Sequence, residues 1–388
     1  MAKISHNIKI LGWVSFLTDV SSEMILPILP LFLKNVLKAT MTSIGVIEGV
    51  AEATASLLKV ASGYWSDRVK KRKPFVVAGY GLSALVKPLL ALTTTWGQVL
   101  GIRFADRVGK GLRTSPRDAL IADTSIISQR GKSFGFHRAM DTLGAALGTL
   151  IAFLLLTWEV EAYRLVFALS IIPGISAILV LVFLLKEKPP ERQEGSDPAL
   201  TKKASKPLPA HLLALMGIMV VFTFANVSYA FFILKINAIG ISVALVPLVY
   251  LFYNLVYAAL SMPFGMLSDR IGRERVLLGG FFLMTLLLWG FSKATSSWQA
   301  WLLFFFYGIT SAIIETIPRT LVSDWAGKDR RASTLGLYHT LVGLASLPAS
   351  ILFGAIWHTY NSATAFTYAM FLSAFSFILL LLFKRVPK

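Results

Sequence analysis

Long apolar blocks alternate with short polar segments along almost the whole chain. The blocks lie near residues 8–37, 42–64, 74–94, 97–123, 133–157, 163–185, 210–234, 242–265, 276–293, 298–323, 333–357 and 363–384. An α-helix rises about 1.5 Å per residue, so about 20 apolar residues are enough to cross a hydrocarbon core of roughly 30 Å. The pattern therefore predicts an all-α membrane protein with twelve transmembrane helices.

The composition agrees with this prediction and excludes several other classes of protein. Of the 388 residues, 55% are hydrophobic and only 15% are charged, which is too apolar for an ordinary soluble protein. Cysteine is absent, so disulfides, thiolate metal sites and cysteine nucleophiles are excluded. The first apolar block runs past the length of a signal peptide without a small-residue cleavage site, and we expect a first span, not a cleaved leader.

The formal net charge of +18 is distributed unevenly along the chain. Basic residues concentrate at alternate ends of the apolar blocks, namely at Lys3, Lys9, Arg68, Lys70, Lys71, Arg72, Lys73, Arg130, Lys132, within 186–206, and at Arg270, Arg273, Arg275, Lys328, Arg330, Arg331, Lys384, Arg385 and Lys388. The positive-inside rule then places both termini in the cytoplasm and accounts for the charge without a nucleic-acid partner. We expect a multi-pass monomer in the inner (plasma) membrane, surrounded by membrane lipid.

The chain divides into two similar halves. Residues 186–209 form a polar segment rich in Pro, Lys and Glu, which predicts a cytoplasmic linker between an N-terminal six-helix bundle (1–185) and a C-terminal one (210–388). GYWSDRVKKRK at 63–73 aligns with GMLSDRIGRER at 265–275, and the same shift of 202 residues aligns Pro116 with Pro318 and His137 with His339. Two pseudo-symmetric bundles in parallel repeat are typical of transporters that bind their substrate between the halves.

These motifs resemble those of the major facilitator superfamily (MFS), and the resemblance covers essentially the whole chain. Its loop signature, approximately G-x-x-x-D-R-x-G-R-[RK], follows the second span of each half, although Lys70 stands where the family prefers glycine. The antiporter pattern of the fifth span is only half met, because Gly144 and Gly148 are present without the proline. The resemblance implies that the signature gates the cytoplasmic side by holding helix ends together. The gating set is Gly63, Asp67, Arg68, Lys71, Gly265, Asp269, Arg270 and Arg273.

Four carboxylates lie within the first two predicted spans, where an ionisable group is costly and usually serves transport. Asp19 and Glu23 are one helical turn apart near the middle of the first span, and Glu48 and Glu52 share one face of the second. A carboxylate couples transport to protons when its protonation differs between the two open states of the carrier. All four are therefore candidates for proton coupling, with Asp19 and Glu52 favoured by their depth.

The fourth predicted span carries an unusual row of charges. Arg103, Asp106, Arg107 and Lys110 fall on one face, which cannot point toward lipid. One interpretation is a site for an anionic substrate, because guanidinium groups bind carboxylate and phosphate bidentately. A second is that the cations neutralise the carboxylates around a site for neutral or cationic amphipaths, and a third is an ion-paired scaffold. The second half offers fewer charges, a Glu315–Arg319 pair, and aromatic residues as a second wall. Its candidate binding residues are Asn226, Tyr229, Asn254 and Tyr257.

No enzymatic motif is present. Gly109-Lys110-Gly111 lacks the spacing of a phosphate loop, and the five histidines lack a metal-ligand spacing, so we expect neither cofactor nor metal. The sequence thus predicts a secondary active transporter, working by alternating access and driven by protons, of a small-molecule substrate that is an organic anion. The alternatives are proton-driven efflux of amphipathic or cationic drugs, and a membrane receptor that does not transport.

Overall fold

The structure is a computed structural model that describes residues 5–69, 71–125, 130–159, 161–185, 208–326 and 331–383, and these ranges contain helices and the turns between them. The first half contains α1 (His6–Glu23), α2 (Leu29–Asn35), α3 (Met41–Val69), α4 (Lys73–Val86), the 3₁₀ helix η1 (Lys87–Leu92), α5 (Trp96–Asp123), α6 (Arg130–Trp158), α7 (Tyr163–Leu169) and α8 (Ile171–Leu184). The second half contains α9 (Ala210–Thr223), α10 (Tyr229–Ala238), α11 (Val246–Ile271), α12 (Arg273–Lys293), α13 (Ser297–Ile314), α14 (Ile317–Trp325), α15 (Arg331–Thr359) and α16 (Ser362–Phe383).

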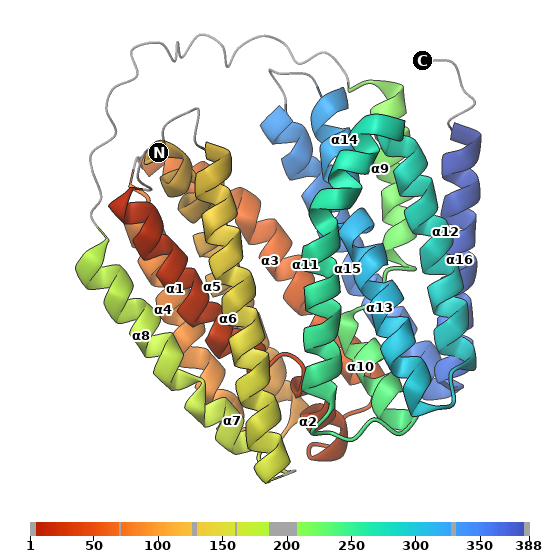
Figure 1. Ribbon diagram of the computed structural model, residues 1–388, viewed down its shortest axis with the longest axis horizontal. Coiled ribbons are helices and arrows are strands. Elements are labelled where there is room, and N and C mark those ends of the chain that lie inside the picture. The colour runs from red at the N-terminus through yellow and green to blue at the C-terminus, as the bar shows by residue number, and fades with distance from the viewer. Residues whose placement is uncertain are drawn as a thin grey trace.

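The helices form two bundles that stand side by side (Figure 1). In five places two consecutive elements lie in line: α1 with α2, α4 with η1, α7 with α8, α9 with α10 and α13 with α14. We call each single helix, or each such pair of elements in line, a rod. Each bundle therefore consists of six rods, which confirms the prediction of an all-α fold built from two six-helix bundles.

Eight rods of the described chain are long and apolar enough to cross a membrane. The remaining four are α1 with α2, α3, α5, and α9 with α10. α3 and α5 carry the charged residues noted above, whereas α1 and α9 are interrupted before they reach the length of a span. The four rods that are least suited to contact lipid are thus the ones with charged side chains or an irregular backbone. Such features are tolerated at membrane depth only where they face protein or a cavity.

The two interruptions lie at equivalent places in the two halves. α1 ends at Glu23 and α2 begins at Leu29, while α9 ends at Thr223 and α10 begins at Tyr229, 200 residues further along. Pro30 occupies the first turn of α2, where its missing N–H costs nothing. In the second interruption no proline is present, and the Ser228 hydroxyl caps α10 by accepting from the Ala230 N–H at 3.4 Å.

The two bundles meet at the end of the molecule where α2 and α10 lie, through contacts of α3 with α15, α6 with α11 and α2 with α10 (Figure 1). Glycines bring the α3 and α15 backbones together there: a Cβ added to Gly45 would lie 2.3 Å from the Ser350 carbonyl oxygen. Toward the other end the helices diverge, and a Cβ on Gly336 would meet Val60 only at 3.8 Å. The start of α1 and the end of α16 lie at this second, open end.

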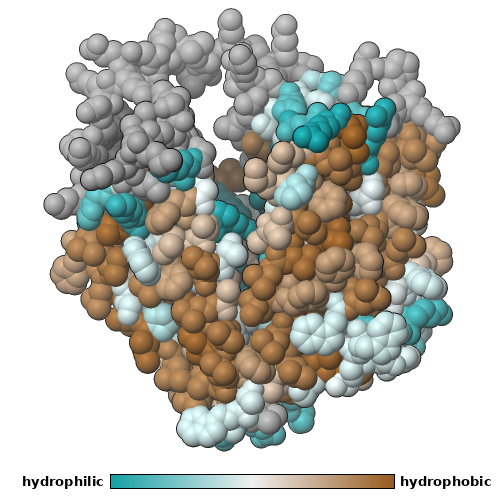
Figure 2. Space-filling view, in the orientation of Figure 1, coloured by the Kyte–Doolittle hydropathy of each residue, from teal (hydrophilic) through white to brown (hydrophobic). Residues whose placement is uncertain are grey.

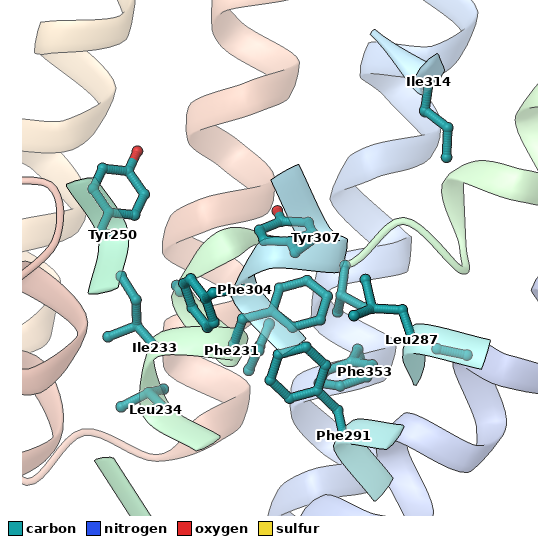
Figure 3. Close-up of a cluster of buried hydrophobic side chains, with 14 of the residues drawn as sticks. Phe231, Ile233, Leu234, Tyr250, Leu287, Phe291, Phe304, Tyr307, Ile314 and Phe353 are labelled. Carbon is teal, nitrogen blue, oxygen red and sulfur yellow. The ribbon is translucent and has the colours of Figure 1, made fainter. Parts of the chain in front are cut away.

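Near the end where α2 and α10 lie, the second bundle contains a dense aromatic core. Phe291 stacks on Phe366 at 5.3 Å between ring centroids, and Phe231 packs on Phe353 at 4.7 Å. Figure 3 shows that the phenylalanines cluster while the hydroxyl of Tyr250 points away from them. This core seals the closed end of the molecule with apolar surface, which stabilises by about 25 cal/mol for each Å² buried.

Candidate functional site

A polar cavity of about 410 Å³ lies between the two bundles. Figure 2 shows hydrophilic side chains in the recess between the bundles, toward the end where both termini lie, and a mainly hydrophobic surface below it. The wall from the first half is charged and includes Glu23, Glu48, Glu52, Lys59, Arg103, Arg107 and Lys110. The opposite wall is aromatic and hydroxylic and includes Phe222, Asn226, Ser228, Tyr229, Tyr250, Tyr253, Tyr307, Thr310, Ser311, Tyr338 and His339, with the charged pair Glu315 and Arg319.

Two of the arginines of α5, Arg103 and Arg107, are anchored by carboxylates. Arg103 donates from Nη2 to Glu48 Oε1 at 3.2 Å, and its Nη1 lies 3.8 Å from Asp106 Oδ2. Arg107 Nε lies 3.7 Å from the same Asp106 oxygen. All four side chains are buried. Breaking a buried pair by removing one partner is costly, so these contacts hold α3 and α5 in register as well as shaping the cavity wall.

Glu48 also connects the two bundles. Its second oxygen, Oε2, accepts a hydrogen bond from the Ser228 hydroxyl at 3.1 Å. Because Ser228 caps α10, the carboxylate lies at the N-terminal end of that helix, where the helix dipole favours negative charge. Glu48 is thus fully engaged by Arg103 and Ser228, and it differs in this respect from the other predicted coupling carboxylates.

Several charged side chains of the first half face the cavity without a direct partner. Glu52 and Lys110 are exposed to it and Lys59 is partly exposed, and within the described chain none of the three side chains makes a hydrogen bond or an ion pair. Glu23 has a buried oxygen, Oε2, for which the described residues provide no hydrogen-bond partner. Acids and amines without partners on the wall of a cavity are available for a ligand or a proton.

The wall from the second half is built from tyrosines that are held by each other. Tyr253 donates to Ser311 Oγ at 3.2 Å and its ring stacks on Tyr307 at 4.5 Å between centroids. The predicted pair of Glu315 and Arg319 is confirmed, with Nη2 and Oε2 2.6 Å apart. Such a wall offers both ring faces and hydroxyl groups, which suits the apolar body and the polar edge of an organic molecule.

The predicted residues divide between two cavities. Arg103, Arg107, Lys110, Asn226 and Tyr229 line the central cavity, as do Glu23, Glu48 and Glu52. Asp19 and Asp106 instead line a smaller chamber of about 60 Å³ inside the first bundle.

Two predicted binding residues of α11 lie elsewhere. Asn254 and Tyr257 are not among the described residues that line the central cavity. The Tyr257 hydroxyl accepts from Arg138 Nη2 at 3.3 Å, at the contact of α11 with α6. Sequence reasoning did not select Lys59, although it lies seven residues after Glu52 and so on the same face of α3.

The loop signatures make equivalent contacts in the two halves. Arg72 forms an ion pair with Asp123 at the end of α5, and Arg273 forms one with Asp324 in α14. Arg273 also donates to the Thr320 carbonyl at 3.1 Å. Each contact joins the loop to the fourth rod of its own half, so in this open conformation the described contacts stabilise each bundle separately.

The remaining residues of the predicted gating set are mostly at the surface. Asp269 Oδ1 lies 3.3 Å from Arg273 Nη2. The Asp67 side chain is outside the part of the chain that the structure describes. Arg68, Lys71 and Arg270 are exposed. A Cβ on Gly63 would lie 3.3 Å from Ser115 of α5, while Gly265 has open space around it.

Comparison with known proteins gives a consistent result. The family description "Major Facilitator Superfamily" matches residues 11–235 and 213–388. An uncharacterized MFS-type transporter of Methanocaldococcus jannaschii is 39% identical over 98% of this chain and 95% of its own length. Multidrug resistance protein MdtG of Enterobacter lignolyticus is 24% identical over 80% of this chain and 76% of its own. The crystal structure of the nucleoside transporter NupG aligns over 98% of both chains with a TM-score of 0.76 and 14% identity, which is a likeness of fold.

Proposed function

Because the chain belongs to the major facilitator superfamily, we propose that this membrane transporter moves a small organic anion together with a proton by alternating access. The observation that carries the proposal is the pair of amines, Lys59 and Lys110, that face the central cavity without partners. The cavity is lined by five cationic side chains and four carboxylates, with histidine counted as neutral, so an anion is favoured by the net charge. The tyrosine wall would hold the apolar body of the same ligand.

The membrane orientation follows from the charge pattern. The positive-inside rule favours a cytoplasmic location for both termini, and we place all twelve rods across the inner membrane of the cell. The end at which the bundles diverge is then the cytoplasmic end, and the conformation is open to the cytoplasm. Segments 1–185 and 210–388 would move as two bodies around the central cavity.

Proton coupling is assigned to Glu23 and Glu52, because they are the cavity carboxylates without a direct partner. Glu52 lies within electrostatic range of Lys110 and Lys59. An organic anion that pairs with these amines would neutralise the positive charge that favours ionised Glu52. Binding of the anion would therefore favour binding of a proton to Glu52. The anion and the proton would then cross together, with the added charges cancelling.

The first experiment measures ligand binding by thermal stabilisation of the purified protein against panels of organic anions and amphipathic cations. An anion that stabilises the protein should lose its effect in Lys59→Gln/Lys110→Gln. Lys293→Gln is the matched control, because Lys293 is an exposed lysine outside the cavity. Undiminished anion binding by the double variant would refute the assignment of the anion site to these two lysines.

The second experiment measures flux of that anion into liposomes under an imposed pH gradient. A proton-driven carrier accumulates the anion only when the gradient is present. Glu52→Gln should retain exchange of the anion and lose accumulation. Accumulation without a pH gradient, or an unchanged response to pH in Glu52→Gln, would contradict the coupling assignment.

Efflux of cationic drugs is the second candidate, and the exposure of Glu52 to a cavity whose opposite wall is rich in tyrosine favours it. The two functions make opposite predictions for the same variants. Binding of an amphipathic cation should be lost in Glu52→Gln and kept or strengthened in Lys59→Gln/Lys110→Gln, because removal of the amines removes repulsion.

A further inference from the structure

Three basic side chains from both bundles converge in the part of the central cavity nearest the open end. Lys59 lies on α3, Arg319 on α14 and His339 on α15, and all three line the cavity. Each lies within electrostatic range of the other two. We call this set the basic cluster. It differs from the charged wall of the first half because two of its three members belong to the second bundle.

The packing of α3 against α15 brings two members of the basic cluster together. A Cβ on Gly343 would lie 2.3 Å from Ser56 Cβ, so the two helices touch at this level. Lys59 is three residues after Ser56 and His339 is four residues before Gly343, and the helices run in opposite directions. Both side chains therefore lie about one helical turn beyond the contact, on the side of the open end. A group bound between them contacts both bundles.

The basic cluster has hydrogen-bond donors that the described chain leaves unused. The Lys59 side chain makes no hydrogen bond or ion pair within this part of the chain, and neither do the ring nitrogens of His339. Arg319 is paired with Glu315 through Nη2 alone, which leaves its Nη1 and Nε. This pair is exposed, with 51% and 45% of the two side chains accessible, and exposed pairs contribute little to stability. Arg319 can therefore bind a ligand at little cost.

Two carboxylates beside the basic cluster decide when an anion binds there. Glu315 pairs with Arg319, and Glu52 lies within electrostatic range of Lys59 and Arg319. Asp118, the next acid near Lys59, has an ion pair of its own within α5. While Glu52 is ionised, the two carboxylates match the two cations. Once Glu52 carries the proton that the proposed function assigns to it, one negative charge is missing, and an anion can supply it.

A substrate must contact both bundles if its binding is to drive alternating access. A ligand shifts a conformational equilibrium only by the difference between its affinities for the two states. If Lys59 and Lys110 alone held the anion, its contacts would be confined to the first bundle and would be nearly the same in both states. Contacts with Arg319 and His339 change as the bundles move, so they supply the difference.

The deeper part of the cavity suits an uncharged body that contains a ring. Tyr307 is twelve residues before Arg319 in the rod formed by α13 and α14, so at 1.5 Å per residue it lies up to about 18 Å closer to the closed end. Tyr253 stacks on its ring at 4.5 Å between centroids, and Tyr250 follows at 5.7 Å from Tyr253. Within the described part of the second half, Arg319 and Glu315 are the only charged side chains of this wall. The wall therefore favours a ligand with one anionic group over a ligand with a second charge at depth.

We propose that the transported anion is a monocarboxylate with an aromatic body, and that Lys59, Arg319 and His339 together hold its carboxylate between the two bundles. Arg319 and His339 are then the contacts of the second bundle with the anionic group. The aromatic body lies along the tyrosine wall and points toward the closed end. This inference rests on the proposed function, to which it adds the class of the substrate, its orientation and its second set of contacts.

The test titrates the purified protein with naphthoate and with its neutral counterpart naphthamide and follows the midpoint of thermal unfolding. Naphthoate should raise the midpoint and naphthamide should not. Arg319→Gln should weaken the binding of naphthoate roughly tenfold or more, because hydrogen bonds between charged groups are lost. Each variant is compared with its own midpoint without probe, so that a change in stability is not counted as a change in binding. Arg275→Gln is the matched control, because Arg275 is an exposed arginine outside the cavity.

A second variant covers the case in which Arg319→Gln does not fold. Glu315→Gln frees Arg319 from its pair and removes a charge that repels the carboxylate, so naphthoate should bind roughly two- to fivefold more tightly. Equal affinities of Arg319→Gln and Arg275→Gln for naphthoate, or binding by Glu315→Gln that is no tighter than the parent's, would overturn the site between the bundles. Absence of stabilisation by naphthoate in the parent would overturn the class of substrate.

These outcomes differ from a failure of the proposed function. If another organic anion binds in a way that depends on Lys59 and Lys110 but not on Arg319, the anion transporter stands and the site between the bundles is wrong. If binding of no anion depends on the two lysines, the proposed anion site itself fails, whatever the effect of Arg319→Gln.

Discussion

The contact between α3 and α15 makes a sharp prediction about the closed end of the molecule. A Cβ on Gly45 would lie 2.3 Å from the Ser350 carbonyl oxygen, whereas ordinary contact begins at 3.4 Å. Gly45→Ala therefore requires the two backbones to separate by about 1.1 Å, the difference between these distances. Because the clash is with a backbone atom, no change of side-chain rotamer can relieve it.

The magnitude follows from the cost of overpacking, which is typically about 1–3 kcal/mol. The cost applies only while α3 and α15 are in contact, so the mutation disfavours this conformation relative to one that opens at the α2/α10 end. A difference of about 1–3 kcal/mol corresponds to roughly a 5- to 150-fold change in the ratio of the two states. The variant should therefore open at the α2/α10 end, the outer end in the proposed orientation, far more often than its parent.

The assay uses the absence of cysteine from the chain. Asn226, which is exposed to the central cavity, is replaced by cysteine and labelled from the outside of vesicles with an impermeant maleimide. The labelling rate should rise by at least fivefold when Gly45→Ala is added. Gly81→Ala in α4 is the control, because nothing lies within 4 Å of the added Cβ. Equal labelling rates in the two variants would refute the reasoning.

Further predictions concern the charges of the cavity. Glu48→Ala leaves Arg103 buried without its main partner and should lower the free energy of unfolding by about 3–5 kcal/mol, measured by thermal or denaturant unfolding. Glu52→Ala, at an exposed position, should change it by less than about 0.5 kcal/mol, and a similar loss in both variants would contradict the assigned difference in burial. Ser228→Ala removes the hydrogen bond between the bundles, worth about 1.5–3 kcal/mol for a charged acceptor, and should raise outside labelling of the Asn226→Cys reporter roughly 10- to 150-fold. Labelling no faster than the parent's would show that Ser228 does not hold the bundles together.

The sequence predicted the positions of the rods, because these depend on local hydropathy, and the repeat, because its motifs recur at a fixed shift of 202 residues. It placed the ends of two rods too early. The predicted blocks 42–64 and 242–265 correspond to α3 and α11, which continue to Val69 and Ile271 through the loop signatures. A helix can extend beyond lipid with polar side chains because its backbone hydrogen bonds are internal, and hydropathy detects only the lipid-embedded part.

The interruptions at 24–28 and 224–228 were not predicted. The residues of the second, Phe224 to Ser228, contain no proline, and the apolar block continues through them. The backbone is irregular there because it faces the cavity and the other bundle, and no local pattern records that environment. Tertiary contacts equally decide which charges are free: Arg103 and Lys110 share one helix face, yet only Arg103 has Glu48 beside it.

Because their charged side chains need partners from neighbouring helices, some helices of the first bundle cannot enter the membrane one at a time during synthesis. α1, α3 and α5 are poor candidates for independent insertion because of their interruption or their charges, whereas the rod from Lys73 to Leu92 and α6 are apolar enough to anchor themselves. The ribosome delivers two of the three weak segments before the first strong one has emerged. The early helices must therefore wait at the translocon until later neighbours arrive, and the first bundle should enter the lipid as a group.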